Sequence, residues 1–178
     1  MTAALTAAPA RLPDPTGLPD LTAPPPADLV VGFDDSRQAR AALGWALANA
    51  ERTGRVTRVV TVYGPGSGQR FGLTSDPGGA VLTRAGLRVA VERGWALVDA
   101  AVAMSHRASP EIDITADAVP GDPRRALREA AGPDGIIVVG EDRDPGSDGS
   151  SVGSTSAWLA AHCRRATVVV RGARDARP

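Results

Sequence analysis

The chain has 178 residues, of which 43% are hydrophobic and 22% are charged, so its size and composition favour one globular domain. Twenty basic residues, all arginine, balance 20 acidic ones, and this net charge of zero predicts neither nucleic acid nor a membrane surface as a partner. Because the chain has no lysine, mechanisms that need a catalytic, Schiff-base or P-loop lysine are excluded.

The cysteine content and the N-terminus predict a location. The single cysteine, Cys163, excludes an internal disulfide, and with two His residues it is too little for a zinc site of ordinary ligand count. Residues 1–12 lack the basic start and the apolar run of a secretory signal. No apolar run approaches the roughly 20 residues that a bilayer span needs. We therefore expect a reducing cytoplasm, no membrane association and no resident metal.

Proline use divides the chain. Seven of the 15 prolines lie within residues 1–27, where the chain can neither pair as a strand nor continue as a helix. We interpret residues 1–27 as a disordered tail, with an interaction arm as the alternative. The folded domain is expected over residues 28–172, followed by a short tail at 173–178.

The first predicted elements are a strand and a helix. Leu29–Phe33 is an apolar run that ends at two aspartates, which indicates a buried strand. Ser36 is a helix N-cap candidate, and the apolar spacing after it predicts a helix over Arg37–Thr53. Gly54 stands where a left-handed glycine ends a helix.

A second strand and helix follow. Val56–Tyr63 is apolar and leads into a glycine-rich loop that extends to about Gly79. Beyond it, a stripe at helical spacing predicts a helix that ends between His106 and Ser109, and its members are Leu87, Val91, Trp95, Val98 and Val102.

The third strand and helix have clear boundaries. In Ile112–Val119 apolar and polar residues alternate, and Asp113 and Asp117 suit the edge of a sheet. The sequence Gly121-Asp122-Pro123 provides an N-cap and an N1 proline for a short helix, which stops at Gly132-Pro133.

The last elements complete the pattern. Gly135–Gly140 is apolar on both faces, as a central parallel strand would be. A helix over Ser154–Cys163 and a strand over Ala166–Arg171 follow. Strands and helices therefore alternate, and the sequence predicts an α/β fold with a five-stranded parallel sheet and helices on both faces.

Two polar loops lie where such sheets bind ligands, beyond the carboxyl ends of the strands. They are residues 32–36 and residues 140–156. Three segments in these loops and between them carry a resemblance to the universal stress protein family, and they are Val30-Val31-Gly32-Phe33-Asp34-Asp35-Ser36, Gly121-Asp122-Pro123, and Gly140 with Gly153-Ser154. The resemblance implies a Rossmann-like sheet of order 3-2-1-4-5, related to the adenine nucleotide alpha hydrolases. Many members hold ATP, others hold no nucleotide, and many are dimers.

The resemblance also implies site residues. Asp34 would contact adenine through its side chain and Val62 through its backbone, whereas the glycines and hydroxyls of the second loop would bind ribose and phosphate. The implied set is Gly32, Asp34, Val62, Gly140, Gly153, Ser154 and Thr155. Two alternatives stay open. Asp34 could only cap the first helix, and the second loop could be a surface loop with a serine N-cap.

One residue departs from the family pattern. Arg143 replaces the second glycine of the loop, where it would either fill the ribose pocket or pair with phosphate. Glu141, Asp142, Asp144 and Asp148 would repel a triphosphate unless a divalent ion such as Mg²⁺ came with it. The loop sequence is therefore compatible with ATP binding and with its loss.

The expected function is regulatory. No nucleophile, base and orienting group form a recognisable motif, so we expect no catalytic residues and at most slow ATP hydrolysis. The first hypothesis is a stress-related sensor that binds ATP between the two loops, and the alternative is a nucleotide-free module that dimerises. The apolar strand Ala166–Arg171 would be an unprotected edge, so a homodimer through this strand is expected.

Overall fold

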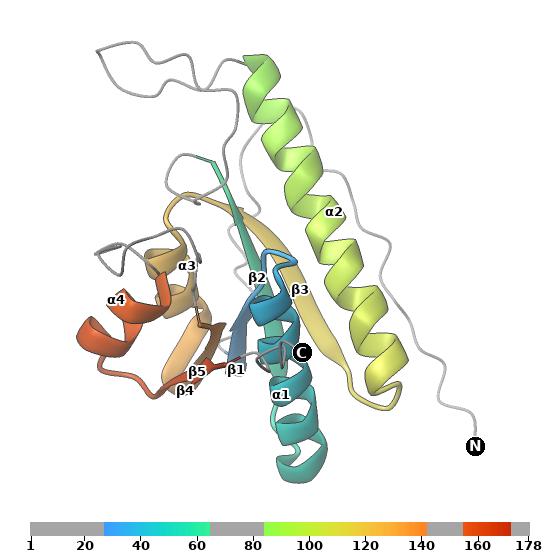
Figure 1. Cartoon of the computed structure of the whole chain (residues 1–178), viewed down its shortest axis with the longest axis vertical. Coiled ribbons are helices and arrows are strands. Elements are labelled where there is room, and N and C mark those ends of the chain that lie inside the picture. Colours follow the sequence, from blue (N-terminus) through green and yellow to red (C-terminus); the bar gives the residue numbers. More distant parts are fainter. Residues whose placement is uncertain (1–26, 65–83, 142–154, 172–178) are drawn as a thin grey trace, which may run out of the picture.

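A computed structural model of the chain describes residues 27–64, 84–141 and 155–171 (Figure 1). All strand pairs in these ranges are parallel, and the sheet has the order β3-β2-β1-β4-β5. The strands are β1 (Ala27–Gly32), β2 (Thr57–Tyr63), β3 (Ile114–Pro120), β4 (Ala131–Gly140) and β5 (Thr167–Val170). The helices are α1 (Arg37–Thr53), α2 (Arg84–Ala108), α3 (Pro123–Ala130) and α4 (Thr155–His162). The predicted fold class and strand order are confirmed.

The sheet separates two hydrophobic clusters. Successive residues of a strand face opposite sides, so Val31 of β1 packs with α1 while Val30 packs against α3 and α4. Helices α1 and α2 cover one face, and α3 and α4 cover the other (Figure 1). The largest buried side chains are Leu29, Leu43 and Leu47 in the first cluster and Leu127, Ile137 and Leu159 in the second.

Local capping signals set the ends of α1. The Ser36 hydroxyl accepts a hydrogen bond from the Ala39 N–H at 3.1 Å, so Ser36 is the N-cap. Gly54 adopts φ 69°, and its N–H donates to the Ala50 carbonyl at 2.8 Å. Both bounds predicted for this helix are confirmed. Strand β1 differs slightly, because it already includes Ala27, the last residue of the expected tail, which is buried and pairs with Ala131.

Helix α2 forms where expected but buries a different stripe. Of the predicted apolar residues only Val98 is buried, and Leu87 is 46% exposed. A Cβ at Gly94 would lie 3.0 Å from Cδ1 of Tyr63, so the absence of a side chain at Gly94 lets the helix lie close to β2. Figure 1 shows the N-terminal end of α2 extending past the sheet, which accounts for the exposure of Leu87. The buried stripe is Ala90, Gly94, Val98, Ala101 and Ser105.

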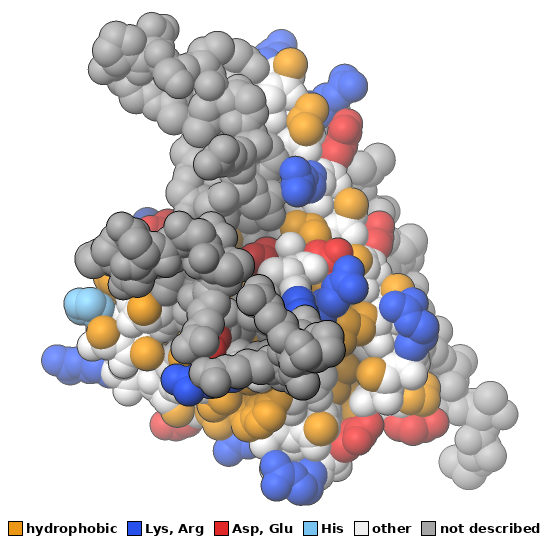
Figure 2. All heavy atoms as spheres, viewed as in Figure 1, with side chains coloured by type: hydrophobic (Ala, Val, Ile, Leu, Met, Phe, Trp, Pro, Cys, Tyr) orange, Lys and Arg blue, Asp and Glu red, His pale blue; other side chains and the backbone are white. Residues whose placement is uncertain are grey.

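The two edges of the sheet differ. On β3, the charge of Asp117 is paired, because its Oδ2 accepts a hydrogen bond from Nε of the buried Arg58 at 2.7 Å. Asp117 is therefore not an isolated charge at this edge. Within the described residues β5 pairs with β4 alone, and Val169 is 36% exposed. Figure 2 shows hydrophobic side chains at the surface between β5 and α1. None of the described helices is both long and apolar enough to cross a membrane.

Candidate functional site at the carboxyl ends of β1 and β4

The strand order reverses beside β1. From β1 the chain passes through α1 to β2 on one side, whereas β4 pairs on the other side and is followed in sequence by α4 on the opposite face of the sheet (Figure 1). The segments that leave the carboxyl ends of β1 and β4 therefore diverge. In open α/β sheets this divergence leaves the crevice in which ligands bind.

The turn after β1 is fixed by hydrogen bonds to β2. The Phe33 N–H donates to the Val60 carbonyl at 3.0 Å, and the buried Thr61 hydroxyl donates to the Phe33 carbonyl at 3.0 Å. Both backbone groups of Phe33 are thus satisfied at the end of the strand. The next residue, Asp34, consequently leaves the sheet from a fixed point.

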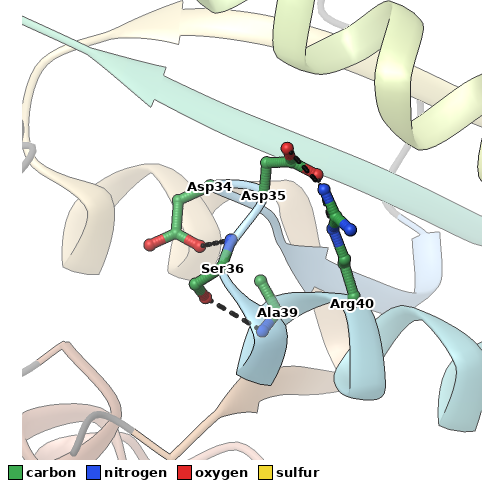
Figure 3. Close-up of polar contacts among 5 residues, drawn as sticks. All are labelled: Asp34, Asp35, Ser36, Ala39 and Arg40. Carbon is green, nitrogen blue, oxygen red and sulfur yellow. Dashed lines mark hydrogen bonds and ion pairs between the residues drawn. The ribbon is translucent and has the colours of Figure 1, made fainter.

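Asp34 is exposed and its carboxylate belongs to the turn. One oxygen, Oδ1, accepts a hydrogen bond from the Ser36 N–H at 3.0 Å (Figure 3). The N-cap of α1 is Ser36, so the helix does not depend on Asp34 for its cap. Among the described residues, Oδ2 of Asp34 has no hydrogen-bond partner. The turn therefore uses one carboxylate oxygen of Asp34 and presents the other.

Asp35 has a separate partner. It adopts φ 64°, in the left-handed region, and its two carboxylate oxygens accept hydrogen bonds from Nε and one terminal nitrogen of Arg40, each at 2.9 Å. These hydrogen bonds hold the pKa of the Asp35 carboxyl below its usual value, against partial burial, which raises it. This pair was not predicted from the sequence, where its only signal is an aspartate five residues before an arginine.

Val62 places its backbone beside the end of β1. Alternate residues of a parallel strand direct their N–H and C=O groups toward the same neighbour. Val60 bonds to Phe33 on the β1 side, whereas the Tyr63 carbonyl accepts from Gly121 on the β3 side. The backbone groups of Val62 therefore point to the β1 side, where β1 has already ended at Gly32. The Val62 side chain is buried in the α3 and α4 cluster.

Two of the expected site glycines have packing roles. A Cβ at Gly140 would lie 2.5 Å from the backbone carbon of Gln38, so only glycine lets the end of β4 approach the first turn of α1 this closely. A Cβ at Gly32 would lie 3.1 Å from Cδ1 of Leu127. Both glycines lie at the carboxyl edge. The close backbone contact at Gly140 is a reason for glycine that needs no ligand, whereas at Gly32 a Cβ would require only a small shift of the Leu127 side chain.

The second loop is described only at its two ends. Glu141 follows β4, its N–H donates to the Val170 carbonyl at 2.8 Å, and its carboxylate lies 3.4 Å from Nε of Arg171. Thr155 is the first residue of α4. The expected site residues Gly153 and Ser154, and the departure at Arg143, lie outside the described residues.

The structure thus brings five expected residues to one edge of the sheet. They come from β1, the turn after it, β2, β4 and α4, and they are Gly32, Asp34, Val62, Gly140 and Thr155. In the described ranges no three His, Cys, Asp or Glu side chains gather in a way that could hold a metal. This edge offers a ligand a carboxylate oxygen, the backbone groups of Val62 that point to the β1 side, and the N-terminal end of α4, which favours anions.

The chain is thus a doubly wound α/β protein with polar residues at the switch point of its sheet, the place where such folds bind ligands. The universal stress protein family model matches residues 28–171, so the chain belongs to this family. No curated protein sequence matches the chain.

Solved structures share the fold. A universal stress protein in complex with cAMP is 24% identical, with a TM-score of 0.57, over 82% of this chain and 97% of that one. The protein UspA from Lactobacillus plantarum is 22% identical, with a TM-score of 0.53, over 80% and 96%. A universal stress protein from Archaeoglobus fulgidus in complex with dAMP is 16% identical, with a TM-score of 0.51, over 79% and 94%. At these identities the likeness is one of fold.

Proposed function

We propose that the chain binds an adenine nucleotide between the turn at Asp34 and the loop after Gly140, and that binding serves a regulatory role. Two observations at the carboxyl ends of the strands carry this proposal. The backbone groups of Val62 point to the β1 side beyond the last paired residue, Gly32, and Oδ2 of Asp34 has no hydrogen-bond partner among the described residues. An adenine ring edge carries an amine donor and ring acceptors, which match a carboxylate together with a backbone strand edge.

Two fold relatives support the choice of ligand. One was crystallised with cAMP and another with dAMP, which are both adenine nucleotides. For this chain we propose that the phosphates lie toward the start of α4 at Thr155, where backbone N–H groups and the helix dipole favour an anion. The hydroxyl of Ser154 and the backbone at Gly153 are the neighbouring groups by sequence.

The acidic loop and Arg143 bear on how many phosphates the bound nucleotide carries. Glu141 begins a segment that also carries Asp142, Asp144 and Asp148, so ATP would need Mg²⁺ to reduce the repulsion. Arg143 either fills space needed by the ribose or pairs with phosphate. An Arg143→Gly variant separates these roles, because higher ATP affinity indicates an occluding arginine and lower affinity indicates a phosphate contact.

Calorimetry of the full chain with AMP, cAMP and Mg-ATP tests the proposal. We expect saturable binding of at least one of them, and we expect Asp34→Ala to weaken it roughly tenfold, as loss of a hydrogen bond to a charged group would. Asp99→Ala, which changes an exposed carboxylate on α2, is the matched control and should bind like the wild type. Absence of binding to all three ligands, or equal loss in both variants, would reject the site.

We also propose a homodimer through β5, which would serve either a nucleotide-binding protein or the nucleotide-free alternative. The carbonyls of Ala166 and Val170 accept hydrogen bonds from Ile137 and Glu141 on the β4 side, so the N–H of Val169 points to the open edge. Three valines and one threonine form this strand, and none carries a charge that would deter pairing.

Proline at Val169 tests the dimer without removing a hydrogen bond to β4. The proline lacks only the N–H that points outward, so the variant should fold. Sedimentation should show a dimer for the wild type and a monomer for Val169→Pro. A wild-type monomer at micromolar concentration would contradict the dimer.

We also propose that the chain has no appreciable turnover of ATP, which a phosphate-release assay with Mg-ATP checks. The cytoplasmic location stays a prediction.

A further inference from the structure

Two neighbouring carboxylates in the turn after β1 point in different directions. Figure 3 shows the Asp35 carboxylate turned to Arg40, while the Asp34 carboxylate lies on the other side of the turn, bonded to the Ser36 N–H. Adjacent carboxylates repel each other, and either could accept a hydrogen bond from the N–H groups at the start of α1. Which of the two carboxylates faces the crevice therefore depends on the other contacts of Asp34 and Asp35.

The positive φ at Asp35 is accompanied by a side-chain contact to α1. Its φ of 64° lies in the left-handed region, which is uncommon for residues other than glycine although aspartate is among the types that adopt it. The guanidinium of Arg40 holds both oxygens of Asp35 at 2.9 Å, in the paired geometry that arginine favours with a carboxylate. Because Arg40 projects from the first turn of α1, the pair ties the turn to a rigid helix.

Removing Arg40 would affect Asp34 through Asp35. Asp35 would lose the contact that compensates its left-handed backbone, and it would carry an unpaired charge beside Asp34. The Asp35 carboxylate could then compete with Asp34 for the Ser36 N–H. Asp34 has one hydrogen bond within the described residues, so a shift of the turn would move the oxygen that it presents.

We propose that Arg40 is a positioning residue that sets the preference of the site for purines with an exocyclic amine. This inference rests on the proposed function. By holding Asp35 on the far side of the turn, Arg40 leaves a single carboxylate, Asp34, to accept the hydrogen bond of the 6-amino group. A 6-oxo purine presents a carbonyl oxygen at that point, so two hydrogen-bond acceptors would face each other and the carboxylate would be left without a donor.

The test is a double-mutant cycle read by calorimetry with AMP and IMP. The wild type should bind AMP at least about tenfold more tightly than IMP, and Arg40→Ala should reduce this ratio by roughly tenfold. In an Asp35→Gly background the turn keeps its positive φ without help, since glycine adopts it freely. There Arg40→Ala should change the ratio by less than about twofold. Arg125→Ala, which breaks another exposed ion pair, is the control and should leave the ratio unchanged.

Two results of the calorimetry would overturn the inference. An equal effect of Arg40→Ala in both backgrounds would mean that Arg40 meets the ligand itself, and no effect in the wild-type background would mean that it positions nothing. If the wild type binds neither nucleotide, the proposed function is rejected, and hydrogen exchange of the ligand-free chain then tests the positioning role of Arg40. Exchange at the Ser36 amide should be faster in Arg40→Ala only when Asp35 is present, and unchanged exchange would refute the positioning role.

Discussion

Two turns at the carboxyl edge connect a strand to a helix, and each has a positive-φ residue directly before the N-cap, but their side chains differ. The β1–α1 turn passes through Asp35 at φ 64°, and the β3–α3 turn passes through Gly121 at φ 117°. Each then reaches an N-cap, Ser36 in one and Asp122 in the other. In the β3–α3 turn, Pro123 completes the helix start, so the N-cap aspartate is its only charged side chain.

The difference indicates which turn does more than connect. In the β3–α3 turn the carboxylate of Asp122 is the cap, accepting from the Arg124 N–H at 2.7 Å. In the β1–α1 turn the cap is a serine, yet the turn carries two further carboxylates, one of which needs Arg40 to hold it. Side chains that a turn does not need for its own geometry are the ones to test for function.

The largest expected effect is a loss of stability on substitution at the end of β4, which packs against the first turn of α1. Gly140→Ala places a Cβ 2.5 Å from the backbone of Gln38, which cannot move without shifting α1. We expect the free energy of unfolding to fall by about 3 kcal/mol, measured by urea denaturation. Gly44→Ala is the control, because nothing lies within 4 Å of its Cβ in mid-helix, and it should stabilise by about 0.5–1 kcal/mol. Equal effects would contradict the close approach.

The two positive-φ residues that directly precede an N-cap, Asp35 and Gly121, should respond differently to substitution. Gly121→Ala forces a side chain into φ 117° and should cost about 1–3 kcal/mol of unfolding free energy. Asp35→Gly relieves a strained residue while it removes an exposed ion pair, so its net effect should stay within about 1 kcal/mol. Thermal unfolding of both variants makes the comparison. A loss at Asp35→Gly as large as that at Gly121→Ala would show that the side chain of Asp35 is essential to the turn.

The cap and the neighbouring carboxylate should separate stability from binding. Ser36→Ala removes the acceptor for the Ala39 N–H and should lower the unfolding free energy by about 1 kcal/mol. Asp34→Ala removes an exposed hydrogen bond and should cost about 0.5 kcal/mol. Denaturation and AMP titration of the two proteins give the comparison. The assignment fails if Asp34→Ala is the more destabilising change while nucleotide affinity stays the same.

The smallest expected effect is a dependence on pH. The pKa of Asp35 is lowered in the fold, so its pair with Arg40 contributes stability above the usual value of 3.8, and this contribution is lost as pH falls through the lowered value. The difference in unfolding free energy between the wild type and Arg40→Ala should therefore be larger at about pH 6 than below about pH 3. A difference that grows on acidification would have the wrong sign.

What could be predicted from the sequence follows the range of the interactions. The bounds of α1 follow from Ser36 and Gly54, which act on their own neighbours in the chain. The buried stripe of α2 could not be predicted, since the sheet accepts the small Gly94 and leaves Leu87 exposed, and this depends on how closely the helix approaches Tyr63. The strand order came from family resemblance rather than from periodicity.

The site could be predicted in position more than in detail. Asp34, Val62 and Gly140 reach the expected edge because each stands at or next to the carboxyl end of its strand. The bond between Asp35 and Arg40 spans five residues and depends on a left-handed backbone that the residue names do not specify. The contact of Gly140 with Gln38 joins segments about a hundred residues apart, so no local pattern indicates it.

An NMR titration with AMP, followed through the chemical shifts of the backbone amides, tests the central claim most directly. If AMP binds between the turn at Asp34 and the loop after Gly140, the amides of Asp34, Ser36, Val62, Gly140 and Thr155 should shift in a saturable way. The chemical shifts of amides at the amino ends of the strands, such as those of Asp28 and Thr57, should not change. Changes confined to the amino ends of the strands or to α2, or no saturable change at all, would contradict the account.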